Sequence, residues 1–311
     1  MKTVSVIGST SPLGVFLVKK LADKDFGVTA TFRSAGLIPD EWADNEAIKT
    51  LELDLNDSLD EKAFSSDTII WLAHLGAGRD NAAEVDINLC AFEKALKVIR
   101  PDKTRRIVFV SSGGSVYGPQ ENVPIREDHE RHPLSSYGKA KRAIEDRLLE
   151  FGRTSGVSTA ILRPGNIYGF ESPDRSTKGV AGAFLRALDL GSRFTLIHGG
   201  ETVRDFIHVD DVCEAVTLAA DSNDEDVVWN VATGTGHTIM DVLQMILAHS
   251  GRSMPETNDV DNYPSDVLVN VLSPERIYDD TGWRAQIDLE SGLRSTVNEW
   301  QLARRFQTFT I

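Results

Sequence analysis

The sequence predicts an α/β protein with a doubly wound parallel sheet and a smaller, interleaved C-terminal lobe. In the first half, short runs of β-branched and apolar residues alternate with longer helix-like segments. This alternation is typical of parallel strands joined by crossover helices. The runs are apolar almost throughout, as expected of strands buried on both faces.

The expected elements follow in order along the chain. Strands are predicted at 3–8, 27–32, 67–73, 105–112 and 157–164, and the helices between them at 13–24, 81–99 and 136–154. After Pro164 the alternation fades, and we expect helices at 179–190, 209–221, 238–249 and 289–306. The run 227–232 is a candidate to rejoin the sheet. The domains expected are therefore 1–165 and 166–311.

Composition excludes several classes of partner. The 311 residues carry 33 Lys and Arg against 47 Asp and Glu, a net charge of −14, which should repel nucleic acid and acidic membranes. Cys90 and Cys213 lie far apart without ligand-like spacing, so we expect neither a disulfide framework nor a metal site. No apolar run approaches the ~20 residues that span a bilayer, and no leader precedes the first strand. These features favour the cytoplasm.

A glycine loop follows the first strand. In "VIGSTSPLG", Gly8 suits a tight turn and Gly14 suits close packing of the next helix. Ser11 and Pro12 fit the N-cap and first position of that helix, whose positive end could hold a pyrophosphate. The middle glycine of the usual fingerprint is missing. The position of the loop still predicts a Rossmann-type dinucleotide site in residues 1–165.

The end of the second strand informs the choice of dinucleotide. An NAD site usually places a carboxylate about 20 residues after the loop. Arg33 stands there instead, and a guanidinium could bind a 2′-phosphate, so NADP is favoured over NAD. Asp54, after the run "TLELD", is placed to touch the adenine edge.

Tyr137 and Lys141 are the candidate proton-transfer pair. They stand four residues apart in "SSYGKAK", at the start of an expected helix, so their side chains share one face. An ammonium beside a phenol favours the ionised phenol, and this would make Tyr137 a usable base. A solvated helix face is the alternative that the spacing alone leaves open.

These motifs together resemble the extended short-chain dehydrogenases/reductases, in particular the UDP-glucose 4-epimerase-like branch of the NAD-dependent epimerase/dehydratase family. The segments that carry the resemblance occur in family order: "VIGSTSPLG", "SSGGSVYG", "YGKAK", "LRPGNIYG", "VRDFIHVDDV" and "VWNVATGTGHTI". The resemblance covers nearly the whole chain. It implies NAD or NADP as cofactor, a nucleotide-sugar substrate and a homodimer formed by helices 81–99 and 136–154.

The resemblance also assigns site residues. It makes Tyr137 the acid/base, and Lys141 its activator and the contact for the nicotinamide ribose. The usual catalytic hydroxyl is replaced by Gly113, so we choose Ser112, with Ser111 and Ser115 as alternatives. Further contacts to the cofactor are expected from Pro12, Leu13, Leu55, Leu72, Ala73 and Pro164.

For the substrate, the resemblance implies that Asn166 contacts the sugar diphosphate and that Arg204 binds its phosphates. Asp266 matches an aspartate of the segment that closes over the nucleotide, but Tyr263 stands where a second arginine is usual. The alternative for Arg204 is an ion pair with Asp205 or Asp210.

The leading function is epimerisation at carbon 4 of a nucleotide-linked hexose. The rival is reduction of a 4-keto-6-deoxyhexose by NADPH, which Arg33 favours. Dehydratase chemistry ranks low, because Gly114 and Ser115 occupy the places of the required acid and base. A non-catalytic dinucleotide sensor is the alternative from another class, and the intact Tyr137 and Lys141 oppose it.

Overall fold

The computed structural model describes residues 1–57, 59–76, 81–173, 179–222, 226–261 and 267–308. The chain forms two compact units. The first contains residues Met1–Tyr117, Glu130–Arg163 and Cys213–Trp229, and the second contains Gly118–His129, Pro164–Val212 and Asn230–Ile311. The chain therefore passes between the units several times, and neither unit is one continuous segment.

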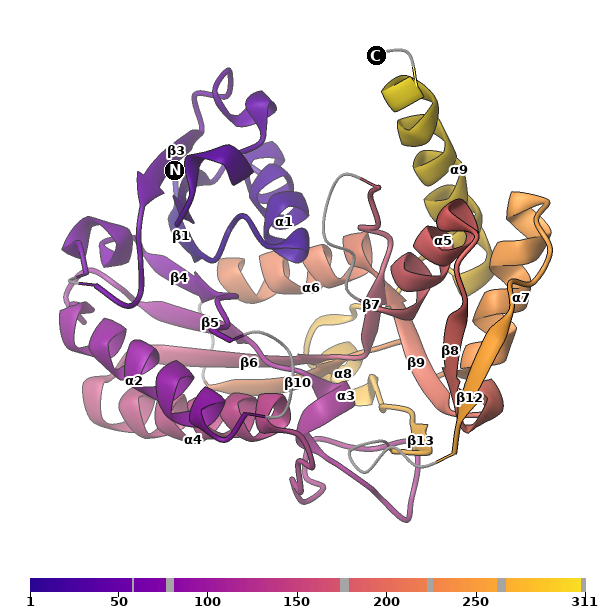
Figure 1. The fold of residues 1–311 in the computed structure, drawn as a ribbon. Coiled ribbons are helices and arrows are strands. Elements are labelled where there is room, and N and C mark those ends of the chain that lie inside the picture. The colour runs from indigo at the N-terminus through magenta and orange to yellow at the C-terminus, as the bar shows by residue number, and fades with distance from the viewer. Residues whose placement is uncertain (58, 77–80, 174–178, 223–225, 262–266, 309–311) are drawn as a thin grey trace. The chain divides into compact units, whose positions relative to one another are not determined.

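The first unit is built on a seven-stranded sheet in the order β10-β6-β5-β4-β1-β2-β3 (Figure 1). Strands β1 to β6 pair in parallel, which confirms the predicted fold class. The bounds are β1 Thr3–Ile7, β2 Gly27–Phe32, β3 Ile48–Glu52, β4 Thr68–Trp71, β5 Arg106–Val110, β6 Ser158–Pro164 and β10 Val227–Val231. Strands β4 and β5 are buried along their whole length, as their apolar sequences predict.

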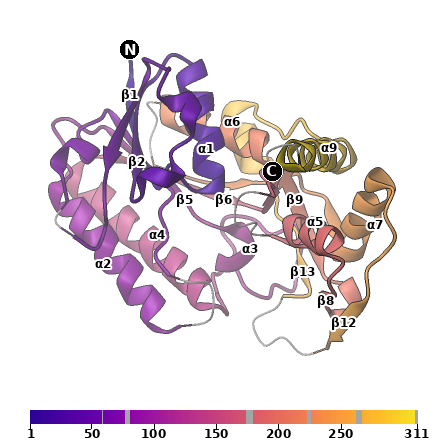
Figure 2. The same ribbon diagram turned by 45° about the horizontal axis from the view of Figure 1, so that its top comes forward.

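Helices cover both faces of this sheet. Helices α2 (Ala83–Val98) and α4 (Ser136–Ser155) lie side by side (Figure 2), and Phe92 of α2 shares one apolar core with Ile144 of α4. Helix α1 (Pro12–Asp23) is linked to α6 (Val209–Asp221) by an ion pair of 2.8 Å between Lys20 and Glu214. The short helix α3 spans Gly113–Val116, and 3₁₀ turns span Ala35–Leu37, Asp40–Trp42 and Glu61–Phe64.

The second unit is centred on strand β9 (Val203–His208). Strands β7 (Asn166–Tyr168) and β13 (Val269–Asn270) pair with β9 in parallel, and β11 (Gly236–Thr238) pairs with it antiparallel. Strands β8 (Phe194–Ile197) and β12 (Thr257–Val260) form a separate parallel pair. The helices of this unit are α5 (Val180–Leu190), α7 (Ile239–Ser250), α8 (Glu275–Thr281) and α9 (Leu289–Thr308), with a 3₁₀ turn at His198–Gly200.

Apolar side chains of α5, α7 and α9 form the core of the second unit, among them Phe184, Leu243 and Trp300. Trp229 and Trp283 are both buried. No helix in the described ranges is both long and apolar enough to cross a membrane.

Candidate active site

The glycine loop lies where β1 meets α1, and its glycines are required by close approaches. Gly8 has a φ of +90°, and a Cβ on it would lie 2.8 Å from the backbone nitrogen of Ala73. A Cβ on Gly14 would lie 2.4 Å from the carbonyl oxygen of Ser9, closer than carbon and oxygen can pack. The loop therefore runs too close to its neighbours at Gly8 and Gly14 for any side chain to fit there.

The first turn of α1 has the predicted cap. The Ser11 side chain accepts a hydrogen bond of 3.1 Å from the amide of Gly14, and Pro12 occupies the first turn. Proline has no N–H, so the amide of Leu13 is the first-turn donor that this cap leaves for an anion. The positive end of α1 adds a favourable field. These features fit the pyrophosphate of a dinucleotide.

The ends of β2 and β3 bring Arg33 and Asp54 together. The amide of Leu53 donates to the carbonyl of Phe32, which aligns the two strand exits. Hydrogen bonds from Asn56 are the largest cause that lowers the pKa of Asp54, and the charge of Arg33 adds to them. The Arg33 side chain is exposed, so it can accept an anion at this edge.

Three further residues expected at the cofactor site lie along the same sheet edge. The amide of Leu72 donates to the carbonyl of Ile7, so Leu72 and Ala73 follow β4 directly beside Gly8. Leu55 is buried just beyond β3. Leu55, Leu72 and Ala73 thus lie at the carboxyl edge of the sheet, where such folds bind dinucleotides. Pro164, also expected at the cofactor, belongs to the second unit.

Tyr137 lies in the first turn of α4, after the N-cap Ser135. Ser112, which follows β5, acts on this hydroxyl in the direction that lowers its pKa. Burial raises the pKa of Tyr137 to about 12, the Ser112 hydrogen bond opposes this rise, and the charge of Glu84 adds to it. The expectation that Lys141 lowers this pKa toward neutrality is therefore wrong for the protein alone, because burial dominates.

Lys141 is buried one turn after Tyr137. Its Nζ donates a 2.9 Å hydrogen bond to the carbonyl of Val110 and lies 5.6 Å from the centroid of the Tyr137 ring. Burial lowers the pKa of Lys141 to about 8, and the charge of Glu145 opposes this shift. The ammonium is thus held beside the phenol ring and tied to the strand that leads into Ser112.

The choice among the serines follows from their partners. The Ser111 hydroxyl donates to the buried carboxylate of Glu145. Ser112 instead acts on the Tyr137 hydroxyl, whose pKa it lowers. Ser115 lies within α3. Ser112 is therefore the hydroxyl best placed for chemistry at Tyr137.

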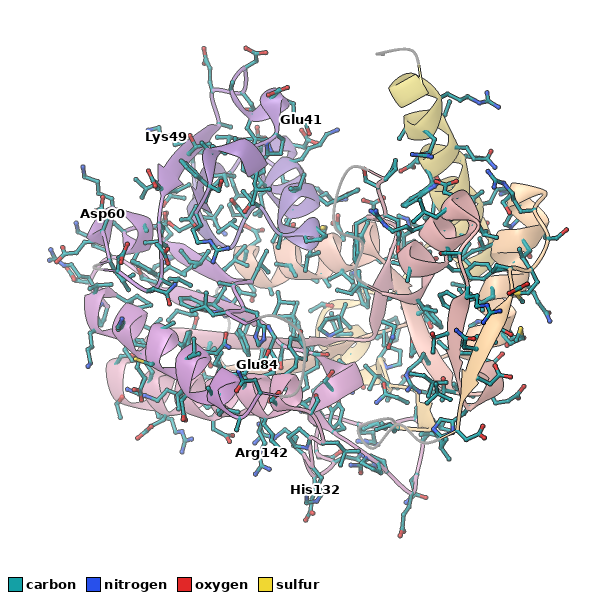
Figure 3. The ribbon with its side chains drawn as sticks, in the orientation of Figure 1. Glu41, Lys49, Asp60, Glu84, His132 and Arg142 are labelled. Atoms are coloured by element: carbon teal, nitrogen blue, oxygen red, sulfur yellow. The ribbon has the colours of Figure 1, made fainter. Side chains whose placement is uncertain are left out.

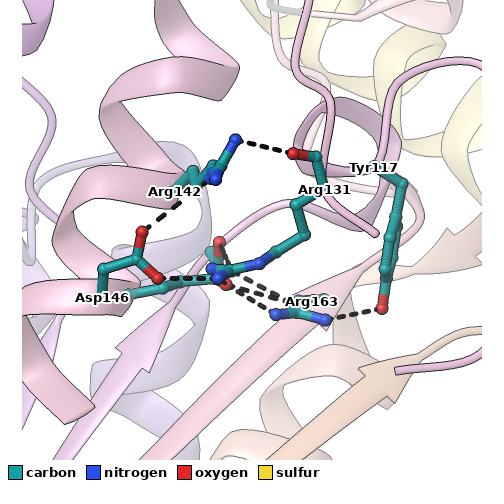
Figure 4. A network of polar contacts seen from close by, with 7 residues as sticks. Tyr117, Arg131, Arg142, Asp146 and Arg163 are labelled. Carbon is teal, nitrogen blue, oxygen red and sulfur yellow. Dashed lines mark hydrogen bonds and ion pairs between the residues drawn. The ribbon is translucent and has the colours of Figure 1, made fainter. Parts of the chain in front are cut away.

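A buried network supports this arrangement (Figure 4). Glu145 receives hydrogen bonds from Arg163 at 2.7 Å and from Arg131 at 2.8 Å, and Arg163 donates to the hydroxyl of Tyr117 at 2.8 Å. Sequence reasoning missed Glu145, although its place four residues after Lys141 on one helical face was a usable signal.

Glu84 was also missed. Its carboxylate is buried in the first turn of α2 and is bonded to His74 and Ser136. Figure 3 labels Glu84 on α2. Nothing in the local sequence connects Glu84 to Tyr137. The two residues come near each other only because α2 packs against α4, which brings Glu84 into contact with Ser136, the neighbour of Tyr137.

The expected substrate residues belong to the second unit. Asn166 begins β7 and pairs in register with Phe206 of β9, two residues after Arg204. Residues two apart in a strand point to the same face, so Asn166 and Arg204 share one face of this sheet. Arg204 also donates to the carbonyl of Val203 at 2.8 Å. Asp266 and Tyr263 lie outside the described residues.

The side chain of Asp205 has a structural role. Its carboxylate accepts hydrogen bonds from the backbone and hydroxyl of Thr233 and from the amide of Gly234. It therefore fixes the loop after β10. His208 is buried with its ring edge-on to Tyr168, so it acts as a packing residue.

Comparisons with known proteins agree with this geometry. Residues 4–232 match the model of the NAD dependent epimerase/dehydratase family. The UDP-glucose 4-epimerase of Mycolicibacterium smegmatis is 28% identical over 313 residues, which cover 96% of this chain and 97% of the relative.

Two solved structures are similar over nearly their whole length. The UDP-glucose 4-epimerase of Thermus thermophilus, in complex with NAD, superposes with a TM-score of 0.81 at 26% identity and covers 96% of this chain and 99% of its own. The UDP-glucose 4-epimerase of Thermotoga maritima, with UDP-glucose, gives a TM-score of 0.81 at 26% identity, with coverages of 97% and 99%.

Proposed function

Because the chain belongs to the NAD dependent epimerase/dehydratase family, we propose that it is an NAD(P)-dependent nucleotide-sugar enzyme that moves hydride at carbon 4 of the hexose, most simply as a UDP-hexose 4-epimerase. The observation that carries this proposal is the buried Lys141, whose Nζ lies 5.6 Å from the centroid of the Tyr137 ring. Ser112 acts on the hydroxyl of the same tyrosine. The epimerase complexes with NAD and with UDP-glucose support the choice of cofactor and substrate class.

In this mechanism Tyr137 takes the proton of the sugar 4-hydroxyl and later returns it. Ser112 donates a hydrogen bond to the same oxygen and orients it. A bound oxidised dinucleotide supplies the hydride acceptor and a positive charge. With a pKa of about 12 in the protein alone, Tyr137 is protonated at neutral pH and can donate its proton. To act as a base it needs positive charge nearby, and the Lys141 ammonium supplies one such charge.

The dinucleotide is assigned to the glycine loop and the sheet edge. The loop from Gly8 to Gly14 would take the pyrophosphate, Lys141 the nicotinamide ribose, and Arg33 with Asp54 the adenosine end. For the substrate we propose that Asn166 and Arg204 bind the diphosphate, where a planar guanidinium suits two phosphate oxygens. The expected role of Asp266 is a contact near the nucleotide.

Arg33 supports a second candidate, an NADPH-dependent reductase of a nucleotide-linked 4-keto-6-deoxyhexose. Its exposed guanidinium stands where an NAD site usually has a carboxylate. In the reductase Tyr137 only donates a proton, which fits its high pKa. Dinucleotide retained through purification separates the candidates: tightly held NAD(H) favours the epimerase, whereas an empty site that responds to NADPH favours the reductase.

We further propose a homodimer through α2 and α4, the helices that the family resemblance assigns to the interface. We also propose the cytoplasm as its compartment, as the cysteine spacing of the sequence favours. Sedimentation of the purified protein tests the dimer.

The function is tested by assaying UDP-, GDP- and dTDP-hexoses and their 4-keto derivatives with each cofactor. Tyr137→Phe should lower kcat by about 10²- to 10⁴-fold, the usual contribution of a general acid/base, while dinucleotide binding persists. The matched control is Tyr278→Phe, which alters an exposed tyrosine of α8. Unchanged turnover of every accepted sugar in Tyr137→Phe would contradict the mechanism.

A further inference from the structure

A second polar pair lies directly against Tyr137. The imidazole of His74, three residues after β4, packs edge-on to the Tyr137 ring with centroids 4.7 Å apart. Its Nε2 is 2.6 Å from Oε1 of Glu84 on α2. Three elements therefore meet at one phenol: the exit of β4, the first turn of α2 and the first turn of α4.

The pair is held from several sides. The Ser136 hydroxyl, next to Tyr137, donates to the other oxygen of Glu84 at 2.8 Å. Asn88, one turn after Glu84, accepts from the amide of Leu75 and donates to its carbonyl, which fixes the segment that carries His74. The side chains of His74 and Glu84 are only 16% and 6% exposed. The position of the imidazole against the phenol is thus set by buried hydrogen bonds.

We propose that His74 and Glu84 are positioning residues for the Tyr137 acid/base: His74 holds the phenol ring in place, and Glu84 sets how readily its hydroxyl gives up a proton. This inference rests on the proposed function and adds two residues to it. The position of the charge supports it. The negative charge of a buried carboxylate near a phenol disfavours the phenolate. The hydrogen bond from His74 to Glu84 disperses part of the negative charge of Glu84.

The groups that face Tyr137 come from each element packed against it. Among the described residues these are Glu84 from α2, His74 after β4, Lys141 one turn along α4, and the uncharged Ser112 after β5. Glu84 opposes the phenolate and Lys141 favours it. Changing Glu84 or its hydrogen-bond donor should therefore move the pKa of Tyr137 in predictable and opposite directions.

The test is direct titration of Tyr137 in the full chain with NAD bound. The protein has five tyrosines, so the ring signals of ¹³C-labelled tyrosine are few, and Tyr137→Phe identifies the one required. Glu84→Gln keeps the shape but removes the charge, and it should lower the pKa of Tyr137 by about one unit. His74→Phe keeps a ring against Tyr137 but removes the hydrogen bond to Glu84, and it should raise this pKa.

The activity profile gives a second readout. Where Tyr137 acts as the base, the rise of kcat with pH should move to lower pH in Glu84→Gln and to higher pH in His74→Phe, with KM unchanged. A merely structural pair would not produce opposite shifts. The matched control is His132→Gln, which alters an exposed histidine paired with Glu130 at 2.7 Å and should shift neither quantity.

The outcomes are separable from those of the proposed function. If the wild type turns over no nucleotide sugar, the proposed function fails, while the titration still decides this inference. Shifts of the same sign in both variants, or none, would overturn the inference. Should His74→Phe not fold, Glu84→Gln decides alone, and an unchanged Tyr137 pKa in that variant overturns the proposal.

Discussion

At Lys141, burial disfavours the positive charge that the proposed mechanism requires. Its ammonium is buried beside Tyr137, and desolvation lowers its pKa to about 8 from 10.5, although Glu145 opposes the shift. Between pH 8 and 10.5 the unfolded chain therefore binds a proton that the folded chain has lost. Stability must rise with pH through this window, since the unfolded state binds more protons there.

Lys141→Met should reveal this linkage. The unfolding free energy of the wild type relative to the variant should increase between pH 8 and 10.5 by up to about 3 kcal/mol, from 1.36 kcal/mol per pKa unit. Denaturant titrations at several pH values measure it, and Lys139→Met, an exposed lysine of α4, is the control. A difference that stays flat or falls with pH would contradict the assignment.

At the scale of elements, α4 organises the site. Tyr137, Lys141 and Glu145 recur every four residues, so they lie along one face of α4, on which Lys141 and Glu145 are buried. Glu145 reaches Ser111 at the end of β5 and Arg163 in β6. One carboxylate thus ties the helix that carries Tyr137 and Lys141 to the strand end that carries Ser112.

Breaking this network should be costly. Glu145→Gln leaves the buried Arg163 without its carboxylate, which costs about 3–5 kcal/mol of unfolding free energy. Arg163→Met should cost less, because Glu145 keeps its hydrogen bond from Arg131. The double variant should lose less than the sum of the two, because neither charge is left without its partner. Chemical denaturation checks this coupling.

The control for this cycle is Arg147→Gln on the same helix. It breaks a partly exposed ion pair with Glu150 and should change stability by less than about 1 kcal/mol. Strictly additive effects at Glu145 and Arg163 would argue against a shared network.

At the scale of the whole molecule, pH stability depends on buried carboxyls as well as on the net charge. In the second unit, burial raises the pKa of Glu171 to about 7, although backbone amides including that of Gly169 oppose the rise. Burial likewise raises the pKa of Asp205. Such groups bind more protons in the folded chain than in the unfolded chain between their two pKa values, so they cause stability to fall as pH rises through that window.

Glu171→Gln isolates one of these groups. Relative to the wild type, the variant should gain stability as pH rises from 4.5 to 7, by up to about 3 kcal/mol at 1.36 kcal/mol per pKa unit. Thermal unfolding across this range measures the difference. The control is Glu256→Gln at an exposed glutamate, which should show no such trend. A relative stability that does not change with pH would contradict a raised Glu171 pKa.

The sequence by itself determined most of the sheet. The runs that form β1, β2, β4, β5 and β6 are locally apolar, and the cap of Ser11 on α1 depends on neighbours within three residues. The Tyr137–Lys141 pair was visible for the same reason, because an i, i+4 contact belongs to one helix. Such features are encoded by adjacent residues, so pattern and spacing suffice to predict them.

Only the tertiary structure decided the electrostatics of the site. Glu84 and Ser136 are 52 positions apart, and they meet beside Tyr137 only because α2 packs against α4. Packing also withdraws the phenol partly from water, so its pKa rises despite the nearby ammonium. The same packing pairs the Ser111 hydroxyl with Glu145 and places Ser112 where it acts on Tyr137. Desolvation and long-range contacts depend on the folded arrangement of distant segments, and no local pattern carries that information.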